Sequence, residues 1–409
     1  MEFDGWVRSE TGDVRWENQD SYLSDPQRGL FLVADGMGGR ADGGKASQMV
    51  IEEVGRIAEE LVERVERANP IVDHHHRRDI LQFLGEEIER INAEIFEAAD
   101  GQMGTTCDLL HLAGEAGFIA HVGDSRIYMI RQGRVVQLTD DHTHAARLER
   151  EARRRKTEVS DLRLERYAHV LTRAIGTDPR VDIDTLFIDV RPGDLFVICS
   201  DGVSDVIDDN DLLEASRTEE PERLADRLVE EAYRGGSTDN ATAVTVSVDG
   251  PEPSSFGEGA PVDTIRKVTF LEQVPLFAEL NSGELLKLLR IVYRHSVAPG
   301  EIIIRRGESA DRMFMVLEGE VSLQVDDREI VRLGPGEHFG EMGLFGTDIR
   351  TADAVPVEET VLLVVPSEEF RRLVESEDPV MGNKLLSRLL EHAADRLQAT
   401  TEELLEARK

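Results

Sequence analysis

Residues 30–36 read LFLVADG, an apolar run that stops at an aspartate followed by a glycine. Three other apolar runs also carry an aspartate at one end, so that the sequence has four such places: Asp35-Gly36, Gly123-Asp124, Asp201-Gly202 and Asp239-Asn240. Any one of these pairs is a common turn signal. Four carboxylates at the ends of neighbouring strands would repel one another unless a cation neutralised them, and all-oxygen ligation favours Mg²⁺ or Mn²⁺ over Zn²⁺.

Two helical segments lie between these apolar runs. Apolar residues recur at helical spacing at Val50, Val54, Ile57, Leu61 and Val65, and again at Leu84, Ile88, Ile91 and Ile95. The short β-branched runs around them are typical of strands. The first 249 residues therefore predict an α+β domain in which helices cover sheets.

The charge of the chain excludes several classes of partner. The 409 residues include 47 Lys and Arg against 82 Asp and Glu, a net charge of −35, which opposes binding to nucleic acid or to anionic membrane surfaces. The first residues do not contain a basic segment followed by an apolar stretch, and no run of about 18 uncharged apolar residues occurs in the sequence. We therefore expect no export and no membrane insertion. Cys107 and Cys199 lie inside apolar runs, which predicts two buried, reduced thiols and a cytoplasmic location.

A change of composition divides the chain. Residues 249–264 are rich in Pro, Gly, Ser and Glu, so we predict a linker at 250–264 between a first domain at 1–249 and a second at 265–375. After a helical segment at 284–292, the second domain has short strands separated by glycines, a spacing typical of a small β-roll. A C-terminal helix is expected over 376–409.

Seven motifs occur in order in the first domain. They are VRWENQDS from Val14, ADGMGG from Ala34, GTT from Gly104, VGDSR from Val122, LTRAIG from Leu171, CSDGV from Cys199 and TDNAT from Thr238. Over residues 8–248 the chain resembles the bacterial-type, metal-dependent protein Ser/Thr phosphatases of the PPM family. The resemblance implies an α-β-β-α sandwich with two metals between the sheets, and phosphoproteins as substrates.

The resemblance also implies roles for individual residues. Asp35 would bridge two Mn²⁺ or Mg²⁺ ions, the Gly36 carbonyl would bind one, Asp201 and Asp239 would bind the other, Asp124 would help to hold a third, Asp20 would hold a metal-bound water, and Arg15 would clamp the substrate phosphate. Arg15, Asp20 and Asp35 are the implied catalytic residues. Gln19 stands where the family often has Glu, which predicts a weaker water contact. Met37 stands where animal members have His, so the group that protonates the leaving oxygen is unassigned.

Three other features have competing interpretations. Residues 39–45, GRADGGK, have P-loop spacing, but Ala46 replaces the metal-binding Ser or Thr, so we reject an ATPase. Basic residues between 147 and 156 lie in the segment that matches the family's flap, at about 140–172, where they are either a docking site for phosphoproteins or a solvated helix face. The histidines at 74–76 are interpreted as a solvated helix end rather than a metal site.

The second domain resembles cyclic-nucleotide-binding domains over about 265–375. Residues 339–352, FGEMGLFGTDIRTA, are similar to that family's phosphate-binding cassette. The resemblance implies a binding site for cAMP or cGMP made by Gly340, Glu341, Met342, Gly343, Leu344, Arg350 and Thr351. Glu341 would accept the ribose 2′-hydroxyl and Arg350 would pair with the cyclic phosphate. The alternative is an empty dimerisation or docking module, and adenine against guanine stays open.

The C-terminal stretch has a short heptad pattern. Leu386, Leu390, Ala393, Leu397, Thr400 and Leu404 follow spacings of four and three. This seam predicts either a homodimer or a helix that packs on its own β-roll.

The sequence as a whole thus predicts a metal-dependent phosphoprotein phosphatase regulated by a cyclic nucleotide. One alternative is a phosphatase whose C-terminal domain serves only in dimerisation or targeting. The other is a non-catalytic signalling scaffold, which the intact Arg15, Asp35, Asp201 and Asp239 oppose.

Overall fold

In the computed structural model the chain divides into two compact units, Met1–Pro261 and Val262–Lys409. The structure describes residues 1–37, 42–71, 73–148, 167–251, 264–277, 280, 282–326, 328–345, 349–374, 381–382 and 384–388. Residues 39–41 of the P-loop-like stretch, residues 149–166 of the flap with most of its basic cluster, the linker residues 252–263 and the heptad seam beyond Leu386 lie outside these residues. Within the described part of the chain, no helix combines the length and the apolar character needed to cross a membrane.

The first unit contains two antiparallel sheets. One has the order β1 (Glu2–Glu10), β11 (Ala241–Asp249), β10 (Leu195–Cys199), β7 (Arg126–Arg131) and β8 (Arg134–Gln137). The other has the order β2 (Asp20–Asp25), β3 (Leu30–Met37), β5 (Cys107–Ala113), β6 (Ala116–Val122) and β9 (Asp184–Asp189), with β4 (Gly104–Thr105) paired to β3. The sheets face each other, since strands of one contact strands of the other.

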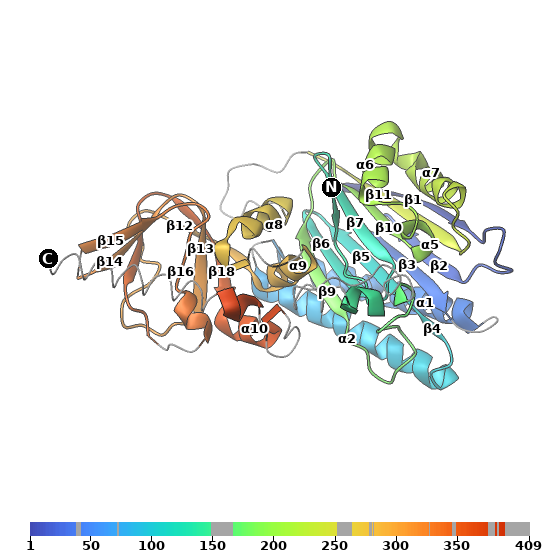
Figure 1. Ribbon diagram of the computed structural model, residues 1–409, viewed down its shortest axis with the longest axis horizontal. Helices are drawn as coiled ribbons and strands as arrows, with labels where there is room; N and C mark the ends of the chain where they lie inside the picture. The colour runs from blue at the N-terminus through green and yellow to red at the C-terminus, as the bar shows by residue number, and fades with distance from the viewer. Residues whose placement is uncertain are drawn as a thin grey trace. The chain divides into compact units, whose positions relative to one another are not determined.

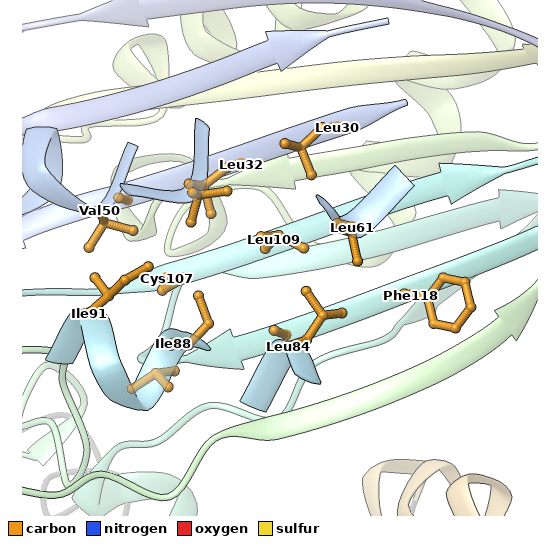
Figure 2. Packing of buried hydrophobic residues seen from close by; sticks show 14 of the residues in the cluster. Leu30, Leu32, Val50, Leu61, Leu84, Ile88, Ile91, Cys107, Leu109 and Phe118 are labelled. Carbon is orange, nitrogen blue, oxygen red and sulfur yellow. The ribbon is translucent and has the colours of Figure 1, made fainter. Parts of the chain in front are cut away.

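Helices cover the outer face of each sheet (Figure 1). The long helices α1 (Asp42–Glu66) and α2 (His74–Ala99) pack on β3, β5 and β6, and Figure 2 shows the apolar side chains that fill this layer. The other sheet is covered by α5 (Asp201–Ser204), α6 (Asp209–Thr218) and α7 (Pro221–Arg234). The predicted α-β-β-α sandwich is confirmed, and both cysteines are buried and free, as expected.

The alternation of side chains along β3 brings its aspartate to the space between the sheets. Leu30, Leu32 and Ala34 belong to the core beneath α1 and α2. Phe31 points the other way, because a Cβ on Gly5 of the opposite sheet would lie only 2.6 Å from its ring. Since side chains alternate with a period of two, Asp35 lies on the same inner face as Phe31, at the far end of the strand.

The second unit is a β-roll with flanking helices. One sheet has the order β12 (Tyr293–Val297), β18 (Thr360–Pro366), β13 (Arg312–Glu318) and β16 (His338–Phe339), and the other β15 (Arg328–Leu333), β14 (Val321–Val325) and β17 (Asp353–Pro356). The helical elements are α8 (Thr264–Gln273), η1 (Pro275–Phe277), α9 (Ser282–Ile291), η2 (Glu341–Phe345) and α10 (Ser367–Arg372). Buried apolar residues of both sheets form one core, which confirms the predicted β-roll.

The start of the C-terminal stretch folds back on this unit's own helices. The Nζ of Lys384 lies 2.7 and 2.6 Å from the two carboxylate oxygens of Glu284 on α9, and that carboxylate is buried. Leu386, the first residue of the heptad pattern, is 42% exposed. The ion pair supports packing on the β-roll for residues 384–388, while the rest of the seam lies outside the described residues.

Candidate metal centre and candidate nucleotide site

The first two aspartates of the candidate metal centre face each other on neighbouring strands. Asp20 at the start of β2 pairs directly with Asp35 near the end of β3. The Asp35 N–H donates to Thr106 Oγ1 at 2.9 Å, and the Thr106 N–H donates to the Asp35 carbonyl at 2.9 Å. Because directly opposed residues of an antiparallel pair point to the same face, both carboxyl groups enter the space between the sheets.

Gly36 permits a close approach of two backbones. A Cβ at this position would lie 2.3 Å from the carbonyl oxygen of Gly43, at the start of α1. The Gly36 N–H donates to the carbonyl of Gln19 at 3.1 Å, so the glycine is also fixed to the segment that leads into β2. Neither Asp35-Gly36 nor Asp201-Gly202 is a hairpin turn, since the former lies within β3 and the latter begins α5.

Asp20 joins the two sheets. Its Oδ2 accepts hydrogen bonds from Ser200 Oγ at 2.8 Å and from Thr242 Oγ1 at 2.7 Å, both on the opposite sheet or at its end. Its Oδ1 is buried without a hydrogen-bond partner among the described protein atoms. One oxygen is therefore held in place while the other is left to a ligand from outside the chain.

Asp201 and Asp239 are brought together by another glycine. A Cβ on Gly202 would lie 1.9 Å from the carbonyl oxygen of Asn240, so the start of α5 can lie against the start of β11 only because residue 202 is glycine. Arg15 Nη2 lies 2.5 Å from Asp239 Oδ2, and the arginine side chain is 51% exposed. The arginine thus stands at the solvent side of the carboxylates.

Asn240 is a supporting residue to which the sequence analysis gave no role. Its side-chain amide donates to the carbonyls of Thr11 and Glu17 at 3.0 Å each, and its Oδ1 accepts from the Gln19 N–H at 3.0 Å. These three hydrogen bonds hold the segment between β1 and β2, which contains Arg15, against the residue that precedes β11. The TDNAT motif includes Asn240. Its supporting role could not be predicted from the motif, because its hydrogen-bond partners lie more than 200 residues earlier in the sequence.

Asp124 lies in the connection between β6 and β7. It follows Gly123, whose φ of +124° and packing against the Thr106 side chain, 2.5 Å from a Cβ position, exclude other residues. The Asp124 side chain is buried, and the nearby charge of Asp201 acts on it. The structure therefore brings Asp124 to the same cluster as the other aspartates.

Burial and mutual repulsion shift the titration of these carboxyl groups. Burial raises the pKa of Asp20 to about 7 and of Asp124 to about 8, and the charge of Asp201 adds to both shifts. Burial, followed by the charges of Asp205 and Asp239, raises the pKa of Asp201 to about 6. Burial and then the charge of Asp20 raise the pKa of Asp35 well above its ordinary value.

These carboxylates fit divalent cations. Crowded, buried carboxylates are unfavourable as anions unless positive charge is supplied, and Oδ1 of both Asp20 and Asp201 is buried with no partner among the described protein atoms. All the donors are oxygens, which suits Mg²⁺ or Mn²⁺.

The cassette of the second unit is built around Arg350. Its guanidinium is buried and donates from Nη2 to the carbonyl of Arg312 at 2.7 Å and from Nη1 to that of Gly340 at 3.4 Å. Asp311 Oδ1 lies 3.7 Å away, and the ring of Phe314 lies 5.7 Å from the guanidinium carbon. Burial lowers the pKa of Arg350, while the carboxylates of Asp311 and Glu341 oppose this shift.

Glycine and small residues shape the rest of the cassette. Gly340 has a φ of +77°, and a Cβ there would lie 2.6 Å from Arg350 Nη1. Glu341 begins η2 and is buried, as are Gly343 and Leu344, whereas Thr351 is exposed. The side chain of Met342 and residues 346–348 lie outside the described part of the structure. Glu341 and Arg350, the two charged residues expected to contact a nucleotide, are thus close enough for their charges to interact.

Residues 15–234, more than half of the chain, match the family described as Protein phosphatase 2C. The chain belongs to the protein phosphatase 2C family. The predicted membership of the metal-dependent Ser/Thr phosphatases is confirmed, and residues 294–377 match the family described as Cyclic nucleotide-binding domain.

Bacterial relatives of this protein phosphatase 2C chain are named as Ser/Thr phosphatases. It is 34% identical over 242 residues to the serine/threonine protein phosphatase PstP of Mycobacterium tuberculosis, covering 59% of this chain and 44% of the relative. It is 27% identical over 251 residues to the serine/threonine phosphatase stp of Listeria monocytogenes, covering 59% of this chain and 94% of the relative. The chain therefore spans less than half the length of the mycobacterial relative.

Solved structures agree with the phosphatase 2C fold of the first unit. A crystal structure of the catalytic domain of PstP in complex with two manganese ions aligns with a TM-score of 0.51 and 31% identity, covering 61% of this chain and 99% of that one. A structure of PstP from Mycobacterium tuberculosis aligns with a TM-score of 0.52 and 30% identity, covering 61% and 100%.

Proposed function

We propose that the first unit hydrolyses phosphoserine and phosphothreonine in proteins with the help of bound Mn²⁺ or Mg²⁺. The observation that carries this proposal is the convergence of Asp20, Asp35, Asp201 and Asp239 at one end of the space between the sheets, with Arg15 beside them. The family match supports the reaction class, and the manganese ions in the PstP structure support the metal. The reaction belongs in the cytoplasm, a location that the buried free thiols favour.

Two or three cations would be held by Asp35, the Gly36 carbonyl, Asp124, Asp201 and Asp239. When bound, such cations supply positive charge that lowers the pKa of water and neutralises phosphoryl oxygens. Asp20 accepts from Ser200 and Thr242 through one oxygen, and its other oxygen can orient a water for attack on phosphorus. No covalent enzyme intermediate is required.

Arg15 binds the phosphate of the substrate. Its exposed guanidinium pairs with Asp239 in the structure, and a planar group with paired donors matches two phosphoryl oxygens. If Asp239 bound a cation, the guanidinium of Arg15 would be available to pair with the phosphate. Asn240 holds the loop that contains Arg15, and these hydrogen bonds would fix the position at which Arg15 binds the phosphate.

The second unit is proposed to bind a cyclic nucleotide and to change the rate of the first. Arg350 would pair with the cyclic phosphate and Glu341 with the ribose 2′-hydroxyl. A tenfold change in rate by this route requires about 1.4 kcal/mol of differential affinity between two states of the protein. The domain boundaries at 249, 264 and 375 and the homodimer through the C-terminal helix stay predictions.

One assay tests both halves of the proposal. Dephosphorylation of a phosphothreonine peptide by the full-length protein is measured with Mn²⁺ and with EDTA, then titrated with cAMP and with cGMP, and repeated with Arg350→Ala. A metal-dependent rate that a nucleotide changes, and that the substitution makes insensitive, supports the regulated phosphatase. A metal-dependent rate indifferent to both nucleotides leaves the second unit as a dimerisation or targeting module, and no rate at all favours the non-catalytic scaffold.

A further inference from the structure

The two most exposed large apolar side chains lie on either side of Arg15. Among the residues that the structure describes, Trp16 is 69% and Val14 is 68% exposed, more than any other large apolar residue. The side chain of Arg15 between them is 51% exposed. Single apolar residues on a surface need no explanation, but two neighbours of this size beside a charged site indicate a contact surface.

The backbone that presents these side chains is fixed at both ends. Gly12 has a φ of +74°, and a Cβ there would lie 2.9 Å from the ring of Tyr233. The hydroxyl of Tyr233 donates to the carbonyl of Glu10 at 3.0 Å. On the other side, the Asn240 amide donates to the carbonyl of Glu17 at 3.0 Å. Because the segment is already ordered, little conformational entropy is lost when a partner contacts it.

The position of Arg15 indicates which partner covers these side chains. Arg15 is proposed to bind the phosphate of the substrate, and the Cα atoms of neighbouring residues are about 3.8 Å apart. Successive residues of an extended peptide advance by about 3.3 Å. The residues before and after a bound phosphothreonine therefore come within reach of Val14 and Trp16.

The charges around the segment restrict the chemistry of that partner. Asp13 is exposed beside Val14, and the chain has a net charge of −35, so an acidic peptide would be repelled. A second copy of the chain would bring the same negative charge to this place, which disfavours self-association here. The side chains of Val14 and Trp16 themselves are uncharged and are stabilised by burial against an apolar group.

We propose that Val14 and Trp16 form a peptide-binding patch that selects phosphoproteins with an apolar residue next to the phosphorylated Ser or Thr. The inference rests on the proposed function, since it takes Arg15 as the phosphate-binding residue. Trp16 is the anchor of the patch, because truncated aromatic side chains cost the most at interfaces. Contact with the patch holds the peptide so that its phosphate lies at Arg15, and the selection is expressed in kcat/KM.

Two phosphothreonine peptides test the patch with the full-length protein and Mn²⁺. The peptides are identical except that both residues next to the phosphothreonine are Leu in one and Ala in the other. We expect the native kcat/KM for the Leu peptide to exceed that for the Ala peptide by at least about tenfold, and Trp16→Ala to bring this ratio to within about twofold of one. A variant that is merely less stable would lower both rates and leave the ratio unchanged.

Two further variants sharpen the comparison of the peptides. Trp16→Phe should keep most of the native ratio, because it retains an aromatic face at this position. Tyr22→Ala is the matched control, since Tyr22 is another exposed aromatic residue of the first unit, at 46%. This control should have the native ratio.

Fluorescence provides a second readout that does not depend on turnover. Trp6 and Trp16 are the two tryptophans of the sequence, so in Trp6→Phe the tryptophan emission comes from Trp16 alone. A peptide with a phosphonate in place of the phosphate is not hydrolysed. Its Leu form should shift the emission of Trp16 to shorter wavelength because the indole leaves water, and its Ala form should shift it much less.

A native ratio near one, or a ratio that Trp16→Ala leaves unchanged, would overturn the proposal. So would an emission shift that follows protein concentration rather than peptide concentration, because a second copy of the chain would then cover the patch. A protein that hydrolyses neither peptide but shows the emission shift with the Leu phosphonate would overturn the proposed function and leave the patch in place. The two failures are therefore distinguishable.

Discussion

The candidate metal centre and the candidate nucleotide cassette differ in where their residues find hydrogen-bond partners. Asp20 is held by Ser200 and Thr242, partners about 200 residues away, whereas Arg350 donates to the carbonyl of Gly340 only ten residues before it. The carboxylates of the metal centre crowd one another, and two of their buried oxygens have no partner among the described protein atoms. The guanidinium of the cassette already has two carbonyl acceptors.

This difference indicates how each site should respond to its ligand. A bound cation should stabilise the crowded carboxylates strongly, because it removes the repulsion between them. A cassette whose arginine is already hydrogen-bonded must exchange those bonds for bonds to phosphate, so only the difference in free energy favours binding. Substitutions should therefore have large effects in the first site and graded effects in the second.

The largest effect is expected for Asp35→Asn. If the Asp35 carboxylate binds the cations, its loss should lower Mn²⁺-dependent dephosphorylation by more than about a hundredfold, since loss of a residue that only supports a ligand costs 10–100-fold. The same variant should unfold at a higher temperature than the native protein in EDTA, because one member of a repelling cluster is neutral. Asp209→Asn, at an exposed position of α6, is the matched control. A rate within tenfold of native would remove Asp35 from the metal centre.

Gly36→Ala tests the close approach of β3 and α1. The added Cβ would lie 2.3 Å from the carbonyl of Gly43, so the end of β3 must shift and carry Asp35 with it. A displacement of about 1 Å can cost about a hundredfold in rate, so we expect a loss of up to that size. Gly55→Ala, in the middle of α1 with open space around the new Cβ, should be neutral or slightly stabilising. Equal rates for both variants would contradict the role given to Gly36.

Much of this contrast was predictable from sequence, and the reason is physical. Apolar runs of period two and helical spacing predict the layers, and Asp35 and Asp201 stand where such runs stop. The supporting residues were not predictable from sequence. Asn240 donates a hydrogen bond to the carbonyl of Thr11, which lies more than 200 positions earlier, and His169 lies 3.3 Å from Asp205 only because the chain is folded. The spacing of residues in the sequence does not predict contacts between segments so far apart. The site roles assigned by resemblance stay predictions until residues such as Asp35 are substituted.

The pH dependence of stability should reveal the repulsion itself. The folded-state pKa values of Asp201, Asp20 and Asp124, about 6, 7 and 8, all exceed the ordinary value of about 3.9. The folded, metal-free protein therefore binds more protons than the unfolded chain, and its stability falls as pH rises from about 4 through these values. In EDTA the melting temperature should drop between pH 5 and about 8.5, and Mn²⁺ should remove most of that drop. A melting temperature that rises with pH in EDTA would contradict this sign.

The smallest effects are expected in the cassette, where two glycines can be compared. Gly340→Ala places a Cβ 2.6 Å from Arg350 Nη1 at a φ of +77°, and Gly343→Ala places one 3.0 Å from Ala310 Cβ at an ordinary φ. Displacing a guanidinium that bonds to a charged phosphate costs about 1.5–3 kcal/mol, so Gly340→Ala should weaken cyclic nucleotide binding by about tenfold or more.

Gly343→Ala should stay within about threefold of the native affinity, because Ala310 has only to move by a few tenths of an ångström. Calorimetric titration of the full-length variants with cAMP and with cGMP measures both effects. If the two substitutions weakened binding equally, the backbone of η2 rather than the position of Arg350 would control the affinity. Nucleotide affinity would then depend on how closely the backbone segments of the cassette pack, as we expect for the candidate metal centre. The two sites would differ only in how far apart in the sequence their hydrogen-bond partners lie.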